Sequence, residues 1–381
     1  MEQSKSMNKY NKWVAMWGNA MSISDHRPAT YAKDLTLRYP VYCPFNGDKI
    51  KITFDNFCGT EAVIISEATV LRKNRFYTLS FEGNKSVTIP GGKSVVCDEL
   101  EMVVNSGDEI IISFYLAEFT LMRSSVVAMG PLSGGQFSVG NHIRDMEVDI
   151  KLARNTDIYY FLSDISVHTE EKNKAMICYG DSITAQDWPD YLLIELKKKG
   201  IDNISIIRKA TSGSRILREY NNITYESYGL KGKNRFHHEM QVDGADSVII
   251  QQGINDIIHP VGTEVNPFRP MSDLPTVEEL IDGLKWYISE GKSYGYKVYL
   301  GTLLPIEGWR TYADFREEMK NSFNDWIKSE NSADGCIDFH SVLCDIENPR
   351  AFKEEYDSGD HLHPSALGYQ RMAEEVLNII F

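Results

Sequence analysis

The sequence predicts an N-terminal β-sandwich or jelly-roll domain over residues 1–172 and an α/β domain over residues 173–381. Three observations predict this division. Short runs of alternating apolar and polar residues fill the first part. Buried apolar runs alternate with amphipathic helices in the second part. The polar stretch TEEKNK, residues 169–174, lies between them and is the expected linker.

In the first part, Ile50, Ile52 and Phe54 alternate with polar residues, which is the period of a strand with one buried face. Turn-forming residues such as PGG at 90–92 separate this strand from its neighbours. Many short strands at this spacing favour a β-sandwich or jelly roll. The expected strands are Lys49–Asp55, Ala62–Ser66, Phe76–Phe81, Ser86–Ile89, Leu100–Val104, Glu109–Leu116 and Tyr159–Val167.

In the second part, strands and helices alternate, which predicts a three-layer parallel sheet of flavodoxin-like order with right-handed crossovers. Ser247–Gln252 is largely apolar, as expected for a strand that is covered on both faces. The other expected strands are Ala175–Gly180, Asn203–Ala210, Lys297–Leu304 and Cys336–Phe339. The expected helices are Trp188–Lys199, Val277–Ser293, Tyr312–Lys328 and Pro364–Ile380.

Composition excludes several classes of partner. A net charge of -14 leaves no basic surplus for contacts to nucleic-acid phosphates. No apolar run of signal-peptide or membrane-spanning length is found, so we expect no membrane partner. The six cysteines are scattered without a CxxC motif, which favours reduced thiols in a cytoplasmic protein. Secretion after removal of a leader and assembly into a homo-oligomer both remain open.

Small polar residues follow two of the expected parallel strands. In a flavodoxin-like sheet, ligands bind at the carboxyl ends of the first and third strands, where strand order reverses. Here the first strand ends in GDS, residues 180–182, and the third ends in GIND, residues 253–256. Glycine permits a sharp turn and a close approach to a ligand. Ser182 is therefore placed where a hydroxyl can act as a nucleophile while its own amide helps to bind an oxyanion.

A serine nucleophile needs a base, and the base needs an orienting acid. The segment DHLHP, residues 360–364, offers both just before the last helix. We expect Asp360 to bond one ring nitrogen of His363 and to leave the other facing Ser182. The Gly213 amide and the Asn255 side-chain amide are candidates for further oxyanion donors.

These residues resemble the SGNH family, also called GDSL esterases and lipases. Its four blocks occur in order: GDSIT at 180–184, the segment holding Gly213, GIND at 253–256, and DHLHP at 360–364. The resemblance implies that Ser182 is the nucleophile, His363 the general base and acid, and Asp360 its orienter. It also implies an oxyanion hole made by the amides of Ser182 and Gly213 with the Asn255 side chain. The first half looks like the β domain that precedes the hydrolase domain in one bacterial branch.

Two positions depart from the family pattern. Arg208 stands near the place where the second block usually has an asparagine, and His361 creates a second histidine beside His363. The two histidines of the last block could share a metal, but no third ligand is obvious. We therefore expect no metal and no cofactor.

Other residues near the blocks have structural as well as functional interpretations. Asp181 is expected to hold its loop by accepting backbone N–H bonds, with substrate contact as the alternative, and Asp256 has the same standing. His259, Trp309 and Tyr312 are candidates for the wall of the substrate pocket, and packing explains them equally well. Arg215 is expected in a salt bridge, with contact to a polar substrate as the alternative. His237 and His238 are expected on the surface, and a capping role is the alternative for Ser182.

The sequence thus predicts a serine esterase that hydrolyses carboxylic esters through an acyl-enzyme. By the resemblance, the expected substrates are small-molecule or glycan esters with short acyl groups, especially acetyl esters of carbohydrates. An acyltransferase with the same triad and a catalytically inert carbohydrate-binding protein remain as alternatives.

Overall fold

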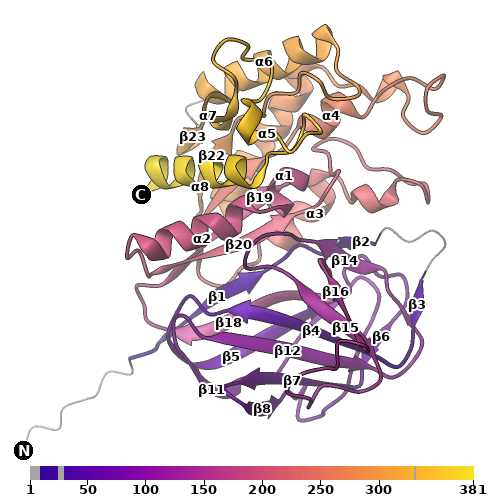
Figure 1. Ribbon diagram of the computed structural model, residues 1–381, viewed down its shortest axis with the longest axis vertical. Helices are drawn as coiled ribbons and strands as arrows, with labels where there is room; N and C mark the ends of the chain where they lie inside the picture. The colour runs from indigo at the N-terminus through magenta and orange to yellow at the C-terminus, as the bar shows by residue number, and fades with distance from the viewer. Residues whose placement is uncertain (1–8, 25–29, 330–331) are drawn as a thin grey trace, which may run out of the picture.

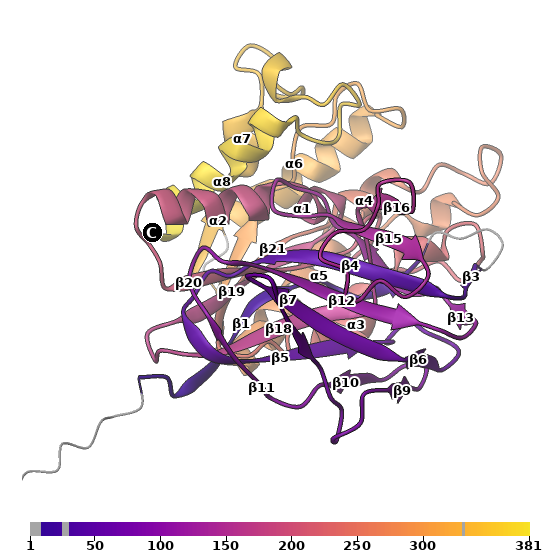
Figure 2. The ribbon, with the colours of Figure 1, turned by 60° about the horizontal axis from the view of Figure 1, so that its bottom comes forward.

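The computed structural model describes residues 9–24, 30–329 and 332–381. Antiparallel strands make up the chain as far as Thr169, and parallel strands alternate with helices from Lys174 onward. The views of Figures 1 and 2 show the antiparallel strands gathered on one side of the molecule and helices α6, α7 and α8 on the other.

Two larger antiparallel sheets dominate the first half. One has the order β1-β18-β5-β10, with β11 also paired to β5, and the other has the order β16-β15-β4-β12-β7-β8. The first sheet comprises β1 Lys12–Gly18, β5 Gly47–Asp55, β10 Ser94–Val96, β11 Leu100–Val104 and β18 Leu162–Thr169. The second comprises β4 Leu35–Tyr42, β7 Glu67–Arg72, β8 Arg75–Thr78, β12 Glu109–Leu116, β15 Gly135–Val139 and β16 Ala153–Thr156.

Buried aromatic rings join these two sheets. Phe54 of β5 contacts Phe114 of β12 with ring centroids 5.2 Å apart, and both side chains are fully buried. In β5, Ile50, Ile52 and Phe54 are buried while the residues between them are partly exposed, so the alternation seen in the sequence matches the buried face. Smaller ladders complete this half: β2 Ser22–Ile23 with β14 Ser124–Val127 and β17 Ile158–Tyr160, β3 Tyr31–Ala32 with β13 Thr120–Leu121, and β6 Val63–Ile65 with β9 Val87–Ile89.

The second half is built on a parallel sheet of order β20-β19-β21-β22-β23. This is the flavodoxin-like order that the sequence predicts, with the reversal between β19 and β21. All seven residues of β20 are buried, because helices cover one face and the N-terminal half lies against part of the sheet. The strands are β19 Lys174–Gly180, β20 Ile204–Ala210, β21 Ala245–Gln251, β22 Lys297–Gly301 and β23 Gly335–Ile337.

Helices flank this sheet. α2 packs against α8, and both lie side by side in Figures 1 and 2. The Tyr179 ring of β19 contacts Phe236 of α3 and Tyr287 of α5. The α-helices are α1 Ser182–Ala185, α2 Trp188–Lys198, α3 Gly232–Glu239, α4 Ile254–Ile258, α5 Val277–Ser293, α6 Asp314–Ser329, α7 Phe339–Leu343 and α8 Ala366–Ile380. Among the described residues, the 3-10 turns η1 Glu226–Tyr228, η2 Met271–Asp273 and η3 Glu354–Tyr356 lie in the connections.

Several boundaries differ from the sequence prediction. The expected strand Tyr159–Val167 is two strands, β17 and β18, because Phe161 between them has a φ of 57° and breaks the extended backbone. The last helix begins at Ala366 and not at Pro364, since the Ser365 side chain caps it by accepting from the Gly368 amide. The strands that were not predicted are β1, β2, β3, β4, β7, β10, β13, β14, β15 and β16, and the helices that were not predicted are α1, α3, α4 and α7.

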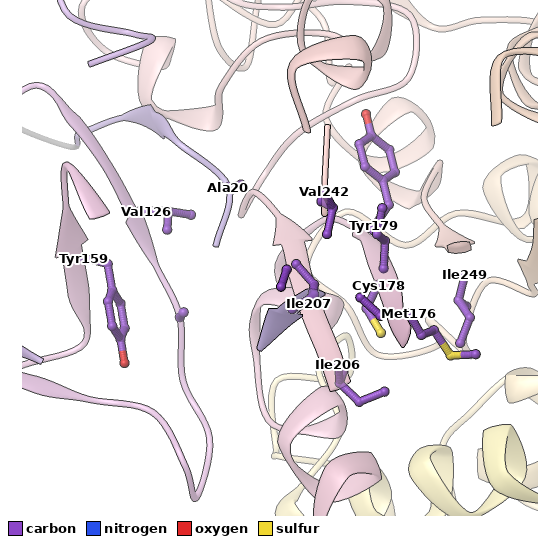
Figure 3. Packing of buried hydrophobic residues seen from close by; sticks show 14 of the residues in the cluster. Ala20, Val126, Tyr159, Met176, Cys178, Tyr179, Ile206, Ile207, Val242 and Ile249 are labelled. Carbon is purple, nitrogen blue, oxygen red and sulfur yellow. The ribbon is translucent and has the colours of Figure 1, made fainter. Parts of the chain in front are cut away.

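The two halves share a continuous buried core. β1 packs against β20, and the backbone of Gly18 comes so close that a Cβ there would lie 2.8 Å from the Ile207 side chain. Figure 3 shows Val126 and Tyr159 of the first half and Val242 and Ile207 of the second, with Ala20 between them. Within the described residues, no helix has the length and apolar character needed to cross a membrane.

Candidate active site

Ser182 lies directly beyond the carboxyl end of β19, at the first position of helix α1. The Asp181 side chain caps this helix by accepting from the Ile183 amide at 3.1 Å. Gly180 allows the end of β19 to approach β21 and α1 closely, since a Cβ there would lie 2.4 Å from the Gln251 carbonyl oxygen and 2.6 Å from the Thr184 hydroxyl oxygen. The Ser182 amide belongs to the first turn of α1, where backbone N–H groups have no intrahelical acceptor.

His363 comes from the loop before α8 and meets Ser182 from across 181 residues of chain. The Ser182 Oγ and the His363 Nε2 are 2.8 Å apart. On the other side of the ring, the His363 Nδ1 lies 2.7 Å from an Asp360 carboxylate oxygen. The structure therefore brings together the three side chains that the sequence singled out.

Asp360 is held as a carboxylate. Partial burial alone would raise its pKa, but hydrogen bonds from the His363 ring and from the backbone amides of His363 and Leu362 lower the pKa of Asp360 to about 2. The carboxylate is therefore ionised throughout the neutral range and fixes the orientation of the imidazole.

The expected oxyanion donors Gly213 and Asn255 line the same cavity as Ser182. Gly213 has a φ of 80°, and a Cβ there would lie 2.6 Å from the Tyr228 ring. The turn at Gly213 thus needs glycine and is backed by an aromatic ring. Asn255, 3% exposed at the start of α4, donates one side-chain N–H to the Ser214 carbonyl at 3.1 Å. That bond fixes the side chain beside the Gly213 turn.

Tyr228 is itself held from the N-terminal half. It belongs to η1, whose Glu226 receives two hydrogen bonds from the Arg123 guanidinium at 2.9 and 3.0 Å. Arg123 follows β13 and also donates to the Cys58 carbonyl at 3.0 Å. Arg123 of the first half therefore holds η1 in place, and Tyr228 of η1 in turn packs against the glycine turn that lines the cavity beside Ser182.

Asp181 and Asp256 do not line the cavity next to Ser182. Both are fully buried, and the Asp256 carboxylate accepts from the amides of Ile216 and Leu217. Burial raises the pKa of Asp181 to about 7 and that of Asp256 to about 6. For Asp181, the structure shows the loop-holding arrangement and not the alternative of substrate contact.

A cavity of about 390 Å³ opens beside Ser182. The expected residues Ser182, Gly213, Asn255 and His363 line it. The N-terminal half forms part of its wall through Ser22, Ile23, Ser24, Ser125, Val126, Val127 and Ile158. Sequence reasoning missed this wall, because the short strands β2 and β14 carry no chemical motif.

His259 and Trp309 both line the cavity, as the pocket interpretation expects, whereas Tyr312 lies outside it. His259 is 6% exposed, and burial together with Arg269, Arg215 and Arg310 lowers its pKa well below the usual value, so the ring is neutral. Four cavity-lining side chains hold a buried polar atom that has no partner among the described residues: Ser22 Oγ, Thr211 Oγ1, His259 Nδ1 and Trp309 Nε1.

The remaining titratable candidates lie elsewhere. The His361 Nδ1 bonds Asp357 at 2.6 Å, so the two histidines of the last block face different carboxylates. Arg208 pairs with Asp190 at 2.9 Å. Arg215 pairs with Asp273 at 3.5 Å, which is the salt bridge expected of it.

The surface assignment holds for His237 and is wrong for His238. His237 is half exposed. The His238 ring stacks on Phe57 at 3.8 Å and bonds the buried Asp55 carboxylate at 2.6 Å. His238 therefore belongs to the contact between the two halves, which the local sequence does not reveal.

Comparisons with known proteins define the family. The model of the GDSL-like lipase/acylhydrolase family matches residues 176–376, which is more than half of the chain. The chain therefore belongs to the GDSL-like lipase/acylhydrolase family, and its parallel half has the hydrolase fold of that family.

Solved structures similar to this chain include two bacterial proteins. A GDSL-like lipase from Bacteroides thetaiotaomicron is 18% identical, with 55% of this chain and 88% of that chain covered and a TM-score of 0.39. An acetylxylan esterase from Geobacillus stearothermophilus is 18% identical, with 54% and 93% covered and a TM-score of 0.40. A comparison with curated proteins finds no match.

Proposed function

We propose that the protein is a serine esterase that hydrolyses carboxylic esters through an acyl-enzyme. The observation that carries the proposal is the hydrogen-bonded line from the Ser182 hydroxyl through the His363 ring to Asp360, with distances of 2.8 and 2.7 Å. A hydroxyl, an imidazole and a carboxylate in this order are the groups that activate a serine for acyl transfer.

In the proposed first step, the Ser182 oxygen attacks the ester carbonyl carbon while His363 Nε2 takes the hydroxyl proton. The carbonyl π electrons move to oxygen, and the amides of Ser182 and Gly213 with the Asn255 side chain stabilise that charge. Collapse of the tetrahedral intermediate breaks the bond to the alcohol oxygen, which receives the proton from His363. The alcohol leaves, and the acyl group remains on Ser182.

Water completes the cycle. His363 takes a proton from the water as its oxygen attacks the acyl carbon, and the second tetrahedral intermediate expels the Ser182 oxygen. His363 returns the proton to Ser182, and the carboxylic acid leaves. Asp360 orients the ring and stabilises the imidazolium in both steps.

We propose short acyl groups, in particular acetyl esters of carbohydrates, as substrates. The cavity of about 390 Å³ is small, which favours a short acyl group. The unpartnered polar atoms of Ser22, Thr211, His259 and Trp309 favour an alcohol that carries several hydroxyls.

We also propose that residues 1–172 form a β-sandwich domain of jelly-roll type and residues 173–381 the hydrolase domain. The contact of Phe54 with Phe114 between the two antiparallel sheets supports a sandwich. The end of β18 at Thr169 and the start of β19 at Lys174 support the boundary. In this proposal the first domain supplies part of the substrate cavity.

Kinetics with 4-nitrophenyl acetate test the activity. We expect Ser182→Ala to lower kcat by about four to six powers of ten while the circular dichroism spectrum stays unchanged. Ser293→Ala, at the exposed end of α5, is the matched control and should keep full activity. A folded Ser182→Ala protein that loses less than tenfold would remove Ser182 from the nucleophile role.

A further inference from the structure

The charged residue that lines the cavity beside Ser182 is basic, whereas the chain as a whole is acidic. The protein has a net charge of -14, yet among the described residues no aspartate or glutamate lines this cavity. Among the described residues, Arg310 is the one basic side chain, lysine or arginine, that lines this cavity. The cavity wall therefore carries positive charge on a protein that is acidic overall.

Arg310 is available to a ligand. Its side chain is exposed, and within the described part of the chain it forms no ion pair with a carboxylate. Its guanidinium carbon lies 4.5 Å from the centre of the Trp309 ring, which also lines the cavity. Stacking on an aromatic face orients the guanidinium without consuming its N–H donors.

Two further arginines add positive charge near Arg310, since Arg215, Arg269 and Arg310 all act on the His259 ring. Arg215 and Arg269 are both buried near His259, where Arg215 lies over the Tyr220 ring and Arg269 over the Tyr225 ring. Of these two arginines, Arg215 is paired with Asp273, at 3.5 Å. The Asp360 carboxylate is bound by the His363 ring and two backbone amides, and among the described residues it forms no ion pair with Arg310.

We propose that the ester substrate carries a second, anionic group and that Arg310 binds this group. A carboxylate is the anion that the planar guanidinium fork fits with two parallel hydrogen bonds. The inference rests on the proposed esterase function, and it narrows the substrates to esters of acidic sugars or esters with an acidic acyl chain. Distant acidic residues oppose this binding weakly, because the screening length at physiological salt is about 8 Å.

Two pairs of esters test the proposal and locate the anion. The first pair differs in the acyl chain: 4-nitrophenyl hydrogen succinate against 4-nitrophenyl butyrate. The second differs in the alcohol: O-acetylated galacturonic acid against O-acetylated galactose, followed by acetate release. The quantity measured is the ratio of kcat/KM for the anionic ester to that for the neutral ester.

We expect the wild-type protein to favour the anionic ester by about tenfold in one of the two pairs, corresponding to about 1.4 kcal/mol. Arg310→Gln should reduce this ratio to about one, and Arg310→Lys should retain part of it. Arg350→Gln is the matched control, since Arg350 is also exposed, pairs with Asp314 and does not line the cavity. This control should keep the wild-type ratio. Added salt should lower the wild-type ratio and leave that of Arg310→Gln unchanged.

A preference in the succinate pair places the anion on the acyl chain, and one in the galacturonate pair places it on the sugar. Equal kcat/KM values in both pairs, or a preference that survives in Arg310→Gln, would overturn the inference while ester hydrolysis itself stands. If the wild-type protein hydrolyses neither these four esters nor 4-nitrophenyl acetate, the proposed function fails; activity on 4-nitrophenyl acetate without activity on either anionic ester overturns the inference alone. Calorimetry with Ser182→Ala gives an independent arm, because galacturonate should bind more tightly than galactose only while Arg310 is present.

Discussion

Two histidines that lie two residues apart, His361 and His363, have different hydrogen-bond partners. His361 and His363 each place Nδ1 on an aspartate, at 2.6 Å from Asp357 and 2.7 Å from Asp360. Only for His363 does the structure record a bond from the other ring nitrogen to Ser182. The sequence assigns the base to His363 and leaves His361 as its rival, because the direction of a ring depends on the backbone of a loop.

Separate replacement of the two histidines tests this assignment. We expect His363→Asn to lower kcat by about 10⁴, since in the proposed mechanism the serine then loses its base. His361→Asn should stay within about threefold of the wild type, because asparagine tolerates the φ of 64° at that position. The measurement is kcat on 4-nitrophenyl acetate. Loss of activity with His361→Asn and its retention with His363→Asn would reverse the assignment.

At the scale of secondary-structure elements, the parallel strands were predicted closely and the antiparallel ones incompletely. The continuous apolar runs of β19 and β21 signal strands that are buried on both faces. Strand β4 carries the buried Arg38, which is accommodated because it donates to the carbonyls of His142, Asp145 and Met146. Because the partners of Arg38 lie more than 100 residues away in the sequence, a local analysis predicts this buried residue to be exposed and does not find the alternation of buried and exposed residues that marks a strand.

The same distinction applies to the site. Ser182, Gly213 and Asn255 could be predicted because each follows a strand of the parallel sheet, whose carboxyl ends meet at one edge. The wall formed by β2 and β14 could not be predicted, because it depends on how the first half packs against the second.

The free energy of unfolding should depend on pH through Asp181, which lies in the turn between β19 and α1. Asp181 has an ordinary unfolded pKa of about 3.9, which burial raises to about 7 in the fold. Its contribution to stability is therefore complete below about pH 4 and is lost as the pH rises through about 7. We expect Asp181→Asn to remove this loss, on the order of 2–4 kcal/mol between pH 4 and 8. Urea unfolding at several pH values measures it, and a mutant-to-wild-type difference that is independent of pH would contradict the account.

The 3-10 turn η1 should act as a positioning element. Arg123→Gln frees Glu226 and loosens Tyr228, which backs the Gly213 turn. We expect kcat to fall about tenfold with little change in KM, because in the proposed mechanism the Gly213 amide acts on the transition state. Glu226→Gln should have the same effect, and the double variant should be no worse than either alone.

Arg72→Gln provides the matched control. Arg72 forms an ion pair of the same kind with Asp108 at 2.6 Å, within the N-terminal half and away from the cavity. This control should lower the Tm without lowering kcat. An equal loss of kcat in Arg72→Gln and Arg123→Gln would show a general effect of destabilisation and not of positioning.

At the scale of the whole molecule, buried polar contacts tie the two halves together. The Lys209 Nζ of β20 lies 2.8 Å from both the Asn19 carbonyl and an Asp164 carboxylate oxygen. The Ser205 hydroxyl donates to the Ala15 carbonyl at 2.6 Å. With the shared apolar core, these bonds fix the antiparallel half beside the cavity to which it contributes.

Removal of one partner from this contact should be costly. Lys209→Met removes a buried cation from the Asp164 carboxylate, whose side chain is 19% exposed, and we expect a loss of about 1.5–3 kcal/mol in the free energy of unfolding. The double variant Lys209→Met/Asp164→Asn should recover part of this loss. Lys174→Met, which breaks an exposed pair with Asp246, should cost less than about 1 kcal/mol. Similar losses for Lys209→Met and Lys174→Met in urea would contradict the buried character of the contact.

The most direct test of the central claim is the covalent reaction of the protein with a fluorophosphonate, followed by mass spectrometry of its peptides. The account predicts one adduct, on Ser182, that disappears in Ser182→Ala and forms far more slowly in His363→Asn. An adduct on another serine, or a folded wild-type protein that does not react, would contradict the assignment of Ser182 as the activated nucleophile.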